Sequence, residues 1–236
     1  MGQMMRLAML ASVALMPIAA ADDADDREAS MPLVFEEDFE SGADRWAPTD
    51  PEAWQVIAED GEHVYALTQQ SAYEPAVRSP FNIAWVKDLD VTDFRMELRF
   101  KQTGREYGHR DLCLFFGKQS DSRFYYVHFA PQADPHANSI FLVNDEPRVS
   151  IASERTEGTR WQDDVYHTAR IDRDTKTGRI TVYFDDMDTP AMVAEDLTFA
   201  SGTIGIGSFD DTGCFDDIRV WGVAAEETEA EADAEE

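Results

Sequence analysis

The middle of the chain carries the side chains best suited to binding or chemistry. Arg110 and Asp111 precede an apolar run, and Tyr126 and His128 share one face of the next predicted strand, because side chains alternate between faces along a strand. Arg148 follows shortly afterwards. Aromatic faces stack on sugar rings, and planar polar groups make paired hydrogen bonds to hydroxyls. We therefore interpret these five residues as ligand-binding residues for a carbohydrate.

Two other interpretations of these residues remain open. A lyase would use Tyr126 and His128 as acid and base against a substrate carboxylate that Arg110 holds. Alternatively, the tyrosine and the histidine are ordinary cross-strand neighbours on a sheet face that is partly exposed to solvent, since aromatic pairs commonly stabilise sheets. The sequence assigns no catalytic residue and does not decide whether the protein is an enzyme.

Acidic residues lie on the apolar phase of the first and last predicted strands. Glu37 stands between two phenylalanines, and Asp217 occupies a comparable position near the carboxyl end. Burying a bare carboxylate is costly, so two such strands side by side would require a cation. Ca²⁺ suits hard oxygen ligands, which makes Glu37, Asp38 and Asp217 the candidate ligands of a structural Ca²⁺. An ion pair with Arg219, or a β-bulge that turns the acids outward, is the alternative.

The elements that must position these residues are short strands. Residues 94–100 alternate between apolar and polar side chains, residues 124–129 and 180–184 are aromatic and β-branched, and Gly/Asp turns separate such runs. Ten or more strands with no helix of βαβ length predict an all-β fold, an antiparallel two-sheet β-sandwich of the jelly-roll type. The two matching ends of the domain predict that its terminal strands are neighbours.

Three segments of the second half resemble a known superfamily. The run from Trp161 to His167 and Ile171, the hairpin 178–186 and the glycine-rich strand 202–207 are similar to the C-terminal half of concanavalin-A-like lectin/glucanase domains. With the acidic first and last strands, residues 33–223 resemble secreted laminin-G-like and 3-keto-disaccharide-hydrolase-like modules. The resemblance implies a sandwich fold and, in many members, a structural Ca²⁺ near the terminal strands. It does not specify a function, because lectins, glycosidases, lyases and adhesive modules share the fold.

The glucanase motif of this superfamily is absent from the middle of the chain. Glu36, Asp38 and Glu40 match its spacing formally, but they lie on the first strand rather than on a central one. A retaining glucanase is therefore not favoured.

The 236 residues carry a formal net charge of −28, with acids concentrated at both ends. We interpret residues 1–21 as a signal peptide, 22–31 as an acidic disordered segment, 32–223 as the β-sandwich domain and 224–236 as an acidic disordered tail. Export places the protein outside the cell or in the periplasm. The acidic surface argues against nucleic acid and against anionic membranes as partners, because it repels phosphate. The oligomeric state is not predicted.

Two cysteines, Cys113 and Cys214, permit either a disulfide in an exported chain or two buried free thiols. The charge, the fold and the central residues together favour an exported module that binds carbohydrate or polysaccharide. A glycoside hydrolase or polysaccharide lyase of the same fold is the second interpretation. An adhesive or structural module without a small ligand is the third.

Overall fold

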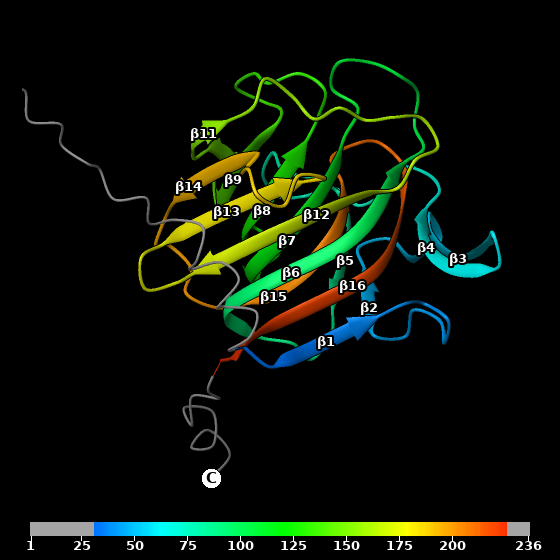
Figure 1. Ribbon diagram of the computed structural model, residues 1–236, viewed down its shortest axis with the longest axis horizontal. Helices are drawn as coiled ribbons and strands as arrows, with labels where there is room; N and C mark the ends of the chain where they lie inside the picture. The colour runs from blue at the N-terminus through cyan, green and yellow to red at the C-terminus, as the bar shows by residue number, and fades with distance from the viewer. Residues whose placement is uncertain (1–30, 226–236) are drawn as a thin grey trace, which may run out of the picture. The chain divides into compact units, whose positions relative to one another are not determined.

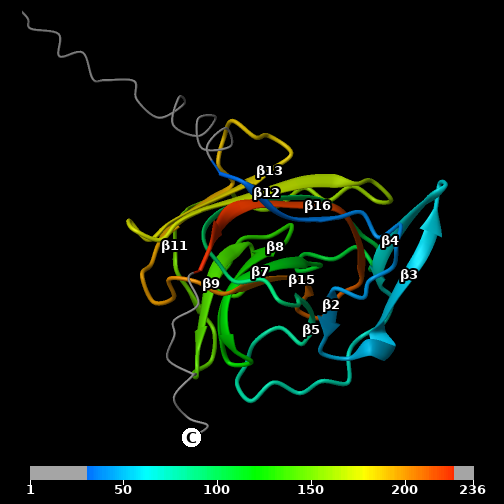
Figure 2. The same ribbon diagram turned by 90° about the horizontal axis from the view of Figure 1, so that it is seen from below.

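The structure, a computed structural model, describes residues 31–225. These residues form two antiparallel sheets that face each other, as Figures 1 and 2 show. The predicted all-β, two-sheet antiparallel sandwich is therefore confirmed. A short 3₁₀ turn, η1 (Pro51–Ala53), interrupts the strands, and no helix within the described residues is long and apolar enough to cross a membrane. The predicted signal peptide and nearly all of both acidic ends lie outside the described residues.

One sheet has nine strands and forms one layer of the sandwich. In spatial order it contains β11 (Ala152–Arg155), β14 (Met192–Glu195), β13 (Arg179–Phe184), β12 (His167–Asp174), β6 (Val91–Gln102), β16 (Gly213–Ala224), β4 (Glu62–Leu67) and β3 (Trp54–Glu59), and β1 (Leu33–Glu37) pairs with β16.

The second sheet has seven strands and carries most of the candidate ligand-binding residues. Its spatial order is β10 (Val149–Ser150), β9 (Ser139–Asn144), β8 (Arg123–Phe129), β7 (Leu112–Ser120), β15 (Thr203–Ser208), β5 (Asn82–Val86) and β2 (Trp46–Pro48).

Strand β6 illustrates how alternation builds the core between the sheets. Phe94, Met96, Leu98 and Phe100 are buried in the main apolar cluster, as the period-2 pattern predicts. Between them, polar side chains point to the opposite face of the sheet. There Arg95 forms an ion pair with a carboxylate of β12.

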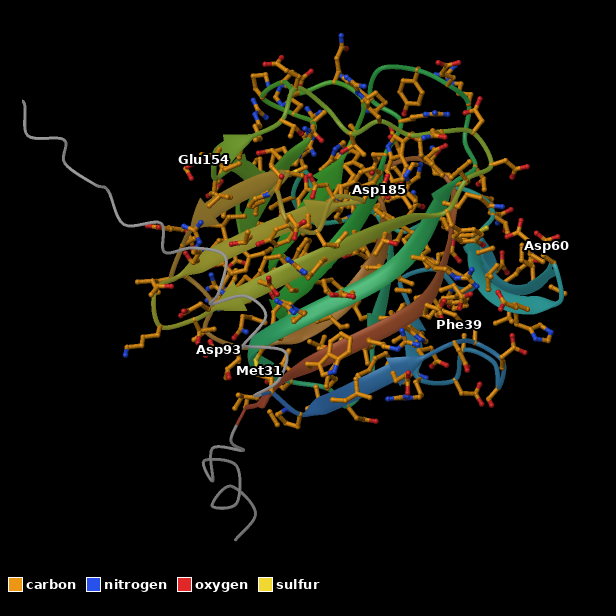
Figure 3. All side chains as sticks on the ribbon, in the orientation of Figure 1. Met31, Phe39, Asp60, Asp93, Glu154 and Asp185 are labelled. Atoms are coloured by element: carbon orange, nitrogen blue, oxygen red, sulfur yellow. The ribbon has the colours of Figure 1, made fainter. Side chains whose placement is uncertain are left out.

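The terminal strands are neighbours, as predicted from their matching composition. β1 pairs antiparallel with β16, and Figure 1 shows the two strands side by side. Phe39 follows β1, is fully buried, and packs with its ring centroid 5.2 Å from that of Tyr65 on β4 (Figure 3). β16 changes register against β6 between Asp216 and Arg219, where Asp217 adopts a φ of 49°. This bulge shifts the side-chain phase of the last strand.

Both faces of the seven-stranded sheet are buried. Its inner face joins the main core, and its outer face carries a second apolar cluster that includes Trp85, Phe115, Phe124 and Phe141. The segment between β4 and β5, residues 68–81, runs along this outer face (Figure 2). Val77 of this covering segment packs against the second cluster. The apolar outer face is therefore kept from water by a strand-free segment of the same chain.

Two glycines of β15 allow the backbone and side chains of β5 to approach closely. A Cβ on Gly205 would lie 2.9 Å from ring carbon Cε3 of Trp85, which covers that part of the outer face. A Cβ on Gly207 would lie 1.8 Å from the carbonyl oxygen of Asn82. These positions require glycine because β5 occupies the space that a side chain would take.

The two cysteines are free and buried. Cys113 lies in the apolar cluster on the outer face of the seven-stranded sheet, whereas Cys214 lies in a small cluster with Val64 and Ala66 of β4 in the other sheet. Of the two alternatives from the sequence, the structure shows the pair of buried thiols. Burial raises the pKa of Cys113 well above its usual range and that of Cys214 to about 11.

We predict that Gly207→Ala destabilises the protein by about 3–5 kcal/mol, because the new methyl group must force β15 away from the β5 backbone. The matched control is Gly61→Ala, where φ is 98° but no atom lies within 4 Å of the added Cβ. We expect that variant to lose only about 1–2 kcal/mol from backbone strain. Urea unfolding measures both, and equal losses would contradict the close-approach explanation.

We also predict that neither thiol of the native protein reacts with a chromogenic disulfide reagent over minutes at pH 8, because buried thiols of raised pKa hold little thiolate. In concentrated urea both thiols should react. Rapid modification of the folded protein, or no titratable thiol after unfolding, would show that the cysteines are not arranged as described.

Candidate functional site

The structure gathers four of the five predicted ligand-binding residues on the outer face of the seven-stranded sheet. Tyr126 and His128 project from β8, Asp111 lies just before β7, and Arg148 lies just before β10. The β7–β8 hairpin places Cys113 directly opposite His128 in the pairing register. Residues distant in sequence therefore meet because adjacent strands carry them on the same face.

Asp111 is the centre of this polar group and is fully buried. Its Oδ2 accepts hydrogen bonds from the backbone N–H of Phe209 at 2.7 Å and from the thiol of Cys113 at 3.1 Å. Its Oδ1 accepts from the hydroxyl of Ser208 at 3.3 Å. Burial raises the pKa of Asp111 to about 7, and the negative charge of Asp211 adds to the increase. The carboxyl group thus acts as a hub that ties the β15–β16 loop to β7.

His128 lies beside this hub and is also buried. Its Nε2 is 3.7 Å from Oδ2 of Asp111, and its Nδ1 accepts a hydrogen bond from the backbone N–H of Asn138 at 3.3 Å. Burial lowers the pKa of His128 to about 3, and the positive charge of Arg148 lowers it further. The imidazole is therefore neutral and serves to hold the loop that precedes β9.

Tyr126 connects the buried group to the surface through Arg148. The tyrosine ring stacks on Phe141 with centroids 5.0 Å apart, and its hydroxyl accepts a hydrogen bond from Nη1 of Arg148 at 2.5 Å. Burial raises the pKa of Tyr126 well above its usual range, so the hydroxyl stays protonated. Arg148 itself is half-buried, and its guanidinium carbon lies 4.2 Å from the ring centroid of Phe209.

Arg110 points elsewhere. Its Nη1 donates to Asp163 at 2.7 Å and its Nη2 to the carbonyl oxygen of Trp161 at 3.3 Å. It is buried beneath the loop before β12 and contributes nothing to the group around Asp111. Four of the five residues predicted from the sequence therefore lie together in the structure, and Arg110 does not lie with them.

Two phenylalanines that sequence reasoning missed lie at the surface end of the buried group. Phe209 follows β15, Phe81 ends the covering segment, and their rings meet edge to face with centroids 5.8 Å apart. Both are half-buried. We call Phe81, Arg148 and Phe209 the rim. A phenylalanine inside an otherwise Gly/Asp-rich turn was the signal in the sequence for Phe209.

The rim contains an unsatisfied donor. The Nε of Arg148 is buried and has no hydrogen-bond partner, although Nη1 is bound to Tyr126 and the guanidinium plane is stacked between Phe141 and Phe209. Buried donors are normally paired, so this N–H is an exception. Because Nε is buried while the residue is only half-buried, a ligand from outside would meet other atoms of the Arg148 side chain.

The predicted calcium ligands are not gathered in the same way. Asp217 forms ion pairs with Arg99 at 2.9 Å and Arg219 at 4.0 Å, while Glu37 accepts a hydrogen bond from the backbone N–H of Phe39 at 3.3 Å. Asp38 is exposed. The contact between Asp217 and Arg219 matches the ion-pair alternative, and among residues 31–225 these three acids form no group whose ligand atoms lie within 4.8 Å of one another.

Ligand-type side chains converge instead around Asp111. Among residues 31–225, two groups of three have ligand atoms within 4.8 Å of one another. One contains Asp111, Cys113 and His128, and the other contains Asp111, Asp210 and Asp211. The structure thus contains an acidic group able to hold a cation, at a place that the sequence did not indicate.

Another buried histidine is structural. His167 forms an ion-pair contact through Nδ1 with Asp185 at 2.7 Å and accepts a hydrogen bond from the backbone N–H of Gln162 through Nε2 at 3.2 Å. Figure 3 labels Asp185 at the turn after β13. Both ring nitrogens are occupied, so this histidine belongs to the core.

Comparison with known proteins identifies the fold. No family model and no curated protein matches the sequence. The carbohydrate-binding module CBM66 from Bacillus subtilis is similar in structure, with 16% identity, a TM-score of 0.54, and 75% of this chain and 96% of that chain covered. A protein of unknown function with a galectin-like fold from Bacillus subtilis has 12% identity and a TM-score of 0.55, covering 81% of this chain and 96% of that one.

A mutant of the GH43 protein BlXynB from Bacillus licheniformis is similar over a smaller part of its length. The identity is 10% and the TM-score 0.55, with 80% of this chain but only 39% of that chain covered. At these identities the likeness concerns the fold alone. The chain therefore shares a two-sheet β-sandwich fold with these proteins, one of which is described as galectin-like.

Proposed function

We propose that this protein is an exported carbohydrate-binding module and that the rim is its ligand-contacting surface. The similarity to CBM66 supports the proposal because it extends over 96% of that module and 75% of this chain, so nearly the whole module has a counterpart here. The leader pattern in residues 1–21 supports export.

The observation that carries the proposal is the half-buried Arg148, which Tyr126 holds in place and which lies against Phe209 at a partly exposed aromatic surface. Phe209 and Phe81 supply apolar faces on which a sugar ring can stack. Arg148 supplies a planar donor to a hydroxyl, or more strongly to a carboxylate or sulfate. An arginine already held by Tyr126 loses little side-chain freedom when a ligand binds, which favours affinity.

The buried residues beneath the rim have a positioning role in this proposal. Asp111, Tyr126 and His128 are each under 5% exposed, so no sugar can contact them without displacement of the covering segment. Tyr126 holds Arg148, while Asp111 holds the backbone of Phe209. Of the five residues predicted from the sequence, only Arg148 contacts a ligand in this proposal. Three others support it from beneath, and Arg110 lies apart.

The enzymatic alternative has less support from this geometry. A lyase needs its acid and base within reach of a substrate carbon, whereas Tyr126 and His128 are both buried. What the GH43 protein does belongs to that longer chain, of which this fold covers 39%.

We predict that Arg148→Ala and Phe209→Ala each weaken binding to the best glycan on an array by at least about tenfold, as expected for residues at the centre of a contact surface. Matched controls are Arg219→Ala and Leu197→Ala, an exposed arginine and an exposed apolar residue away from the rim. These should bind as the unmodified protein does. Product release, assayed on each glycan that binds, should be absent.

Three outcomes would contradict the proposal. Binding that survives both rim substitutions would place the sugar elsewhere on the sandwich. Turnover of a bound glycan would favour the enzymatic interpretation. Binding to no glycan would favour an adhesive or structural module.

A further inference from the structure

A second set of side chains, distinct from the rim, meets where β6 ends and β15 turns into β16. Asp210 and Asp211 lie in the β15–β16 loop, and Asp111 lies at the start of β7. Their ligand atoms are within 4.8 Å of one another. Asp111 and Asp211 are buried and Asp210 is exposed, so two of the carboxylates are shielded from solvent and the third faces it.

No lysine or arginine within the described residues forms an ion pair with any of these three carboxylates. The hydrogen bonds they accept come from neutral groups: Tyr107 donates to Asp211 at 2.6 Å, and the backbone N–H of Asp111 donates to the same oxygen at 2.9 Å. The guanidinium of Arg105 is stacked 5.0 Å from the Tyr107 ring centroid and acts on Asp211 through its charge at a distance, without an ion pair. Three acids so close together require a positive charge or shared protons.

An independent observation points to a ligand at the same place. Gln102, the last residue of β6, is 2% exposed, yet neither its Oε1 nor its Nε2 has a hydrogen-bond partner. Such an orphaned buried amide is rare, because desolvation of both polar atoms is left uncompensated.

The amide of Gln102 and the carboxylate of Asp211 face the same point. A Cβ built on Gly104 would lie 2.8 Å from Nε2 of Gln102 and 2.8 Å from Oδ1 of Asp211. The space therefore remains because residue 104 has no side chain. Rotation of the Gln102 amide about its last side-chain bond exchanges its nitrogen and oxygen and directs the carbonyl oxygen toward this point.

From this geometry we infer a cation site formed by Asp111, Asp210, Asp211 and the amide oxygen of Gln102, with Ca²⁺ as the ion. Ca²⁺ prefers six to eight oxygen ligands in flexible arrangements, and carboxylates with an amide carbonyl are typical of its sites. The exposed Asp210 gives a hydrated ion a route of entry, and water completes the shell on that side. The ion would fasten the β15–β16 loop to the ends of β6 and β7.

The neighbouring group of Asp111, Cys113 and His128 offers no comparable signal. The thiol of Cys113 already donates to Asp111, and the Nδ1 of His128 already accepts from Asn138. Neither residue has an atom among the buried unsatisfied ones. A soft metal ion there would have to replace satisfied contacts, whereas the oxygen-rich site has an unsatisfied amide.

The test compares the melting temperature of the full chain in chelator with that in millimolar Ca²⁺, without any sugar. Saturation at about 100 times the dissociation constant should raise the melting temperature by about 5–10 °C. Asp210→Asn removes the negative charge of an exposed ligand, and Gly104→Ala fills the space between Gln102 and Asp211. Both should fold and lose most of this increase.

Two variants that remove the same charge elsewhere serve as controls. Asp44→Asn changes an exposed acid, and Asp217→Asn changes the ion-paired acid of β16, where asparagine also tolerates the positive φ. Both should keep the full increase. An unmodified protein that does not respond to Ca²⁺ would overturn the inference, and so would an increase retained in Asp210→Asn and Gly104→Ala. Loss in Asp217→Asn alone would place the ion at the terminal strands and also overturn it. Because no glycan is present, these outcomes are independent of the proposed carbohydrate binding.

Discussion

Burial of the seven-stranded sheet on both faces is the constraint from which the rest of the structure follows. A sandwich needs only one dry face per sheet, but here residues 68–81 cover the other face as well. Every polar side chain on that face must then find a partner inside the protein. Asp111 and His128 do so, and Tyr126 does so through Arg148 at the edge of the covered area. The rim is the place where this buried network reaches water.

The nine-stranded sheet handles polarity differently, because its outer face carries charges in pairs. Arg95 of β6 meets Asp172 and Arg99 meets Asp216 across neighbouring strands, and Lys101 reaches Glu59 at the end of β3. Such pairs allow long side chains to lie over the sheet without leaving isolated buried charges. One sheet is thus shielded by a segment of chain and the other by its own ion pairs.

Alternation along the strands made much of this fold predictable. The strand at residues 94–100 and the meeting of Tyr126 with His128 follow from period 2, and the pairing of the terminal strands followed from their composition. Arg110 could not be placed, because adjacent residues at a strand start point to opposite sides. The face of β16 on which the Asp217 side chain lies could not be predicted either. It depends on a bulge at which Asp217 has a positive φ, and no sequence pattern specifies that bulge. Phe209 gains its role only from segment 68–81, which lacks any periodicity.

The pairing of β1 with β16 also has a consequence for how the domain can be joined to others. Leu33 lies opposite Trp221, so the chain enters and leaves the sandwich at one corner. Between Trp221 and the β15–β16 loop beside the rim lie the nine residues from Gly213 to Trp221 of β16, a length of roughly 27 Å. A second domain attached at either end would therefore lie at the end of the sandwich opposite the rim. The same holds for a host protein into whose loop this domain is inserted. Such an attachment would leave the rim free of the joined protein.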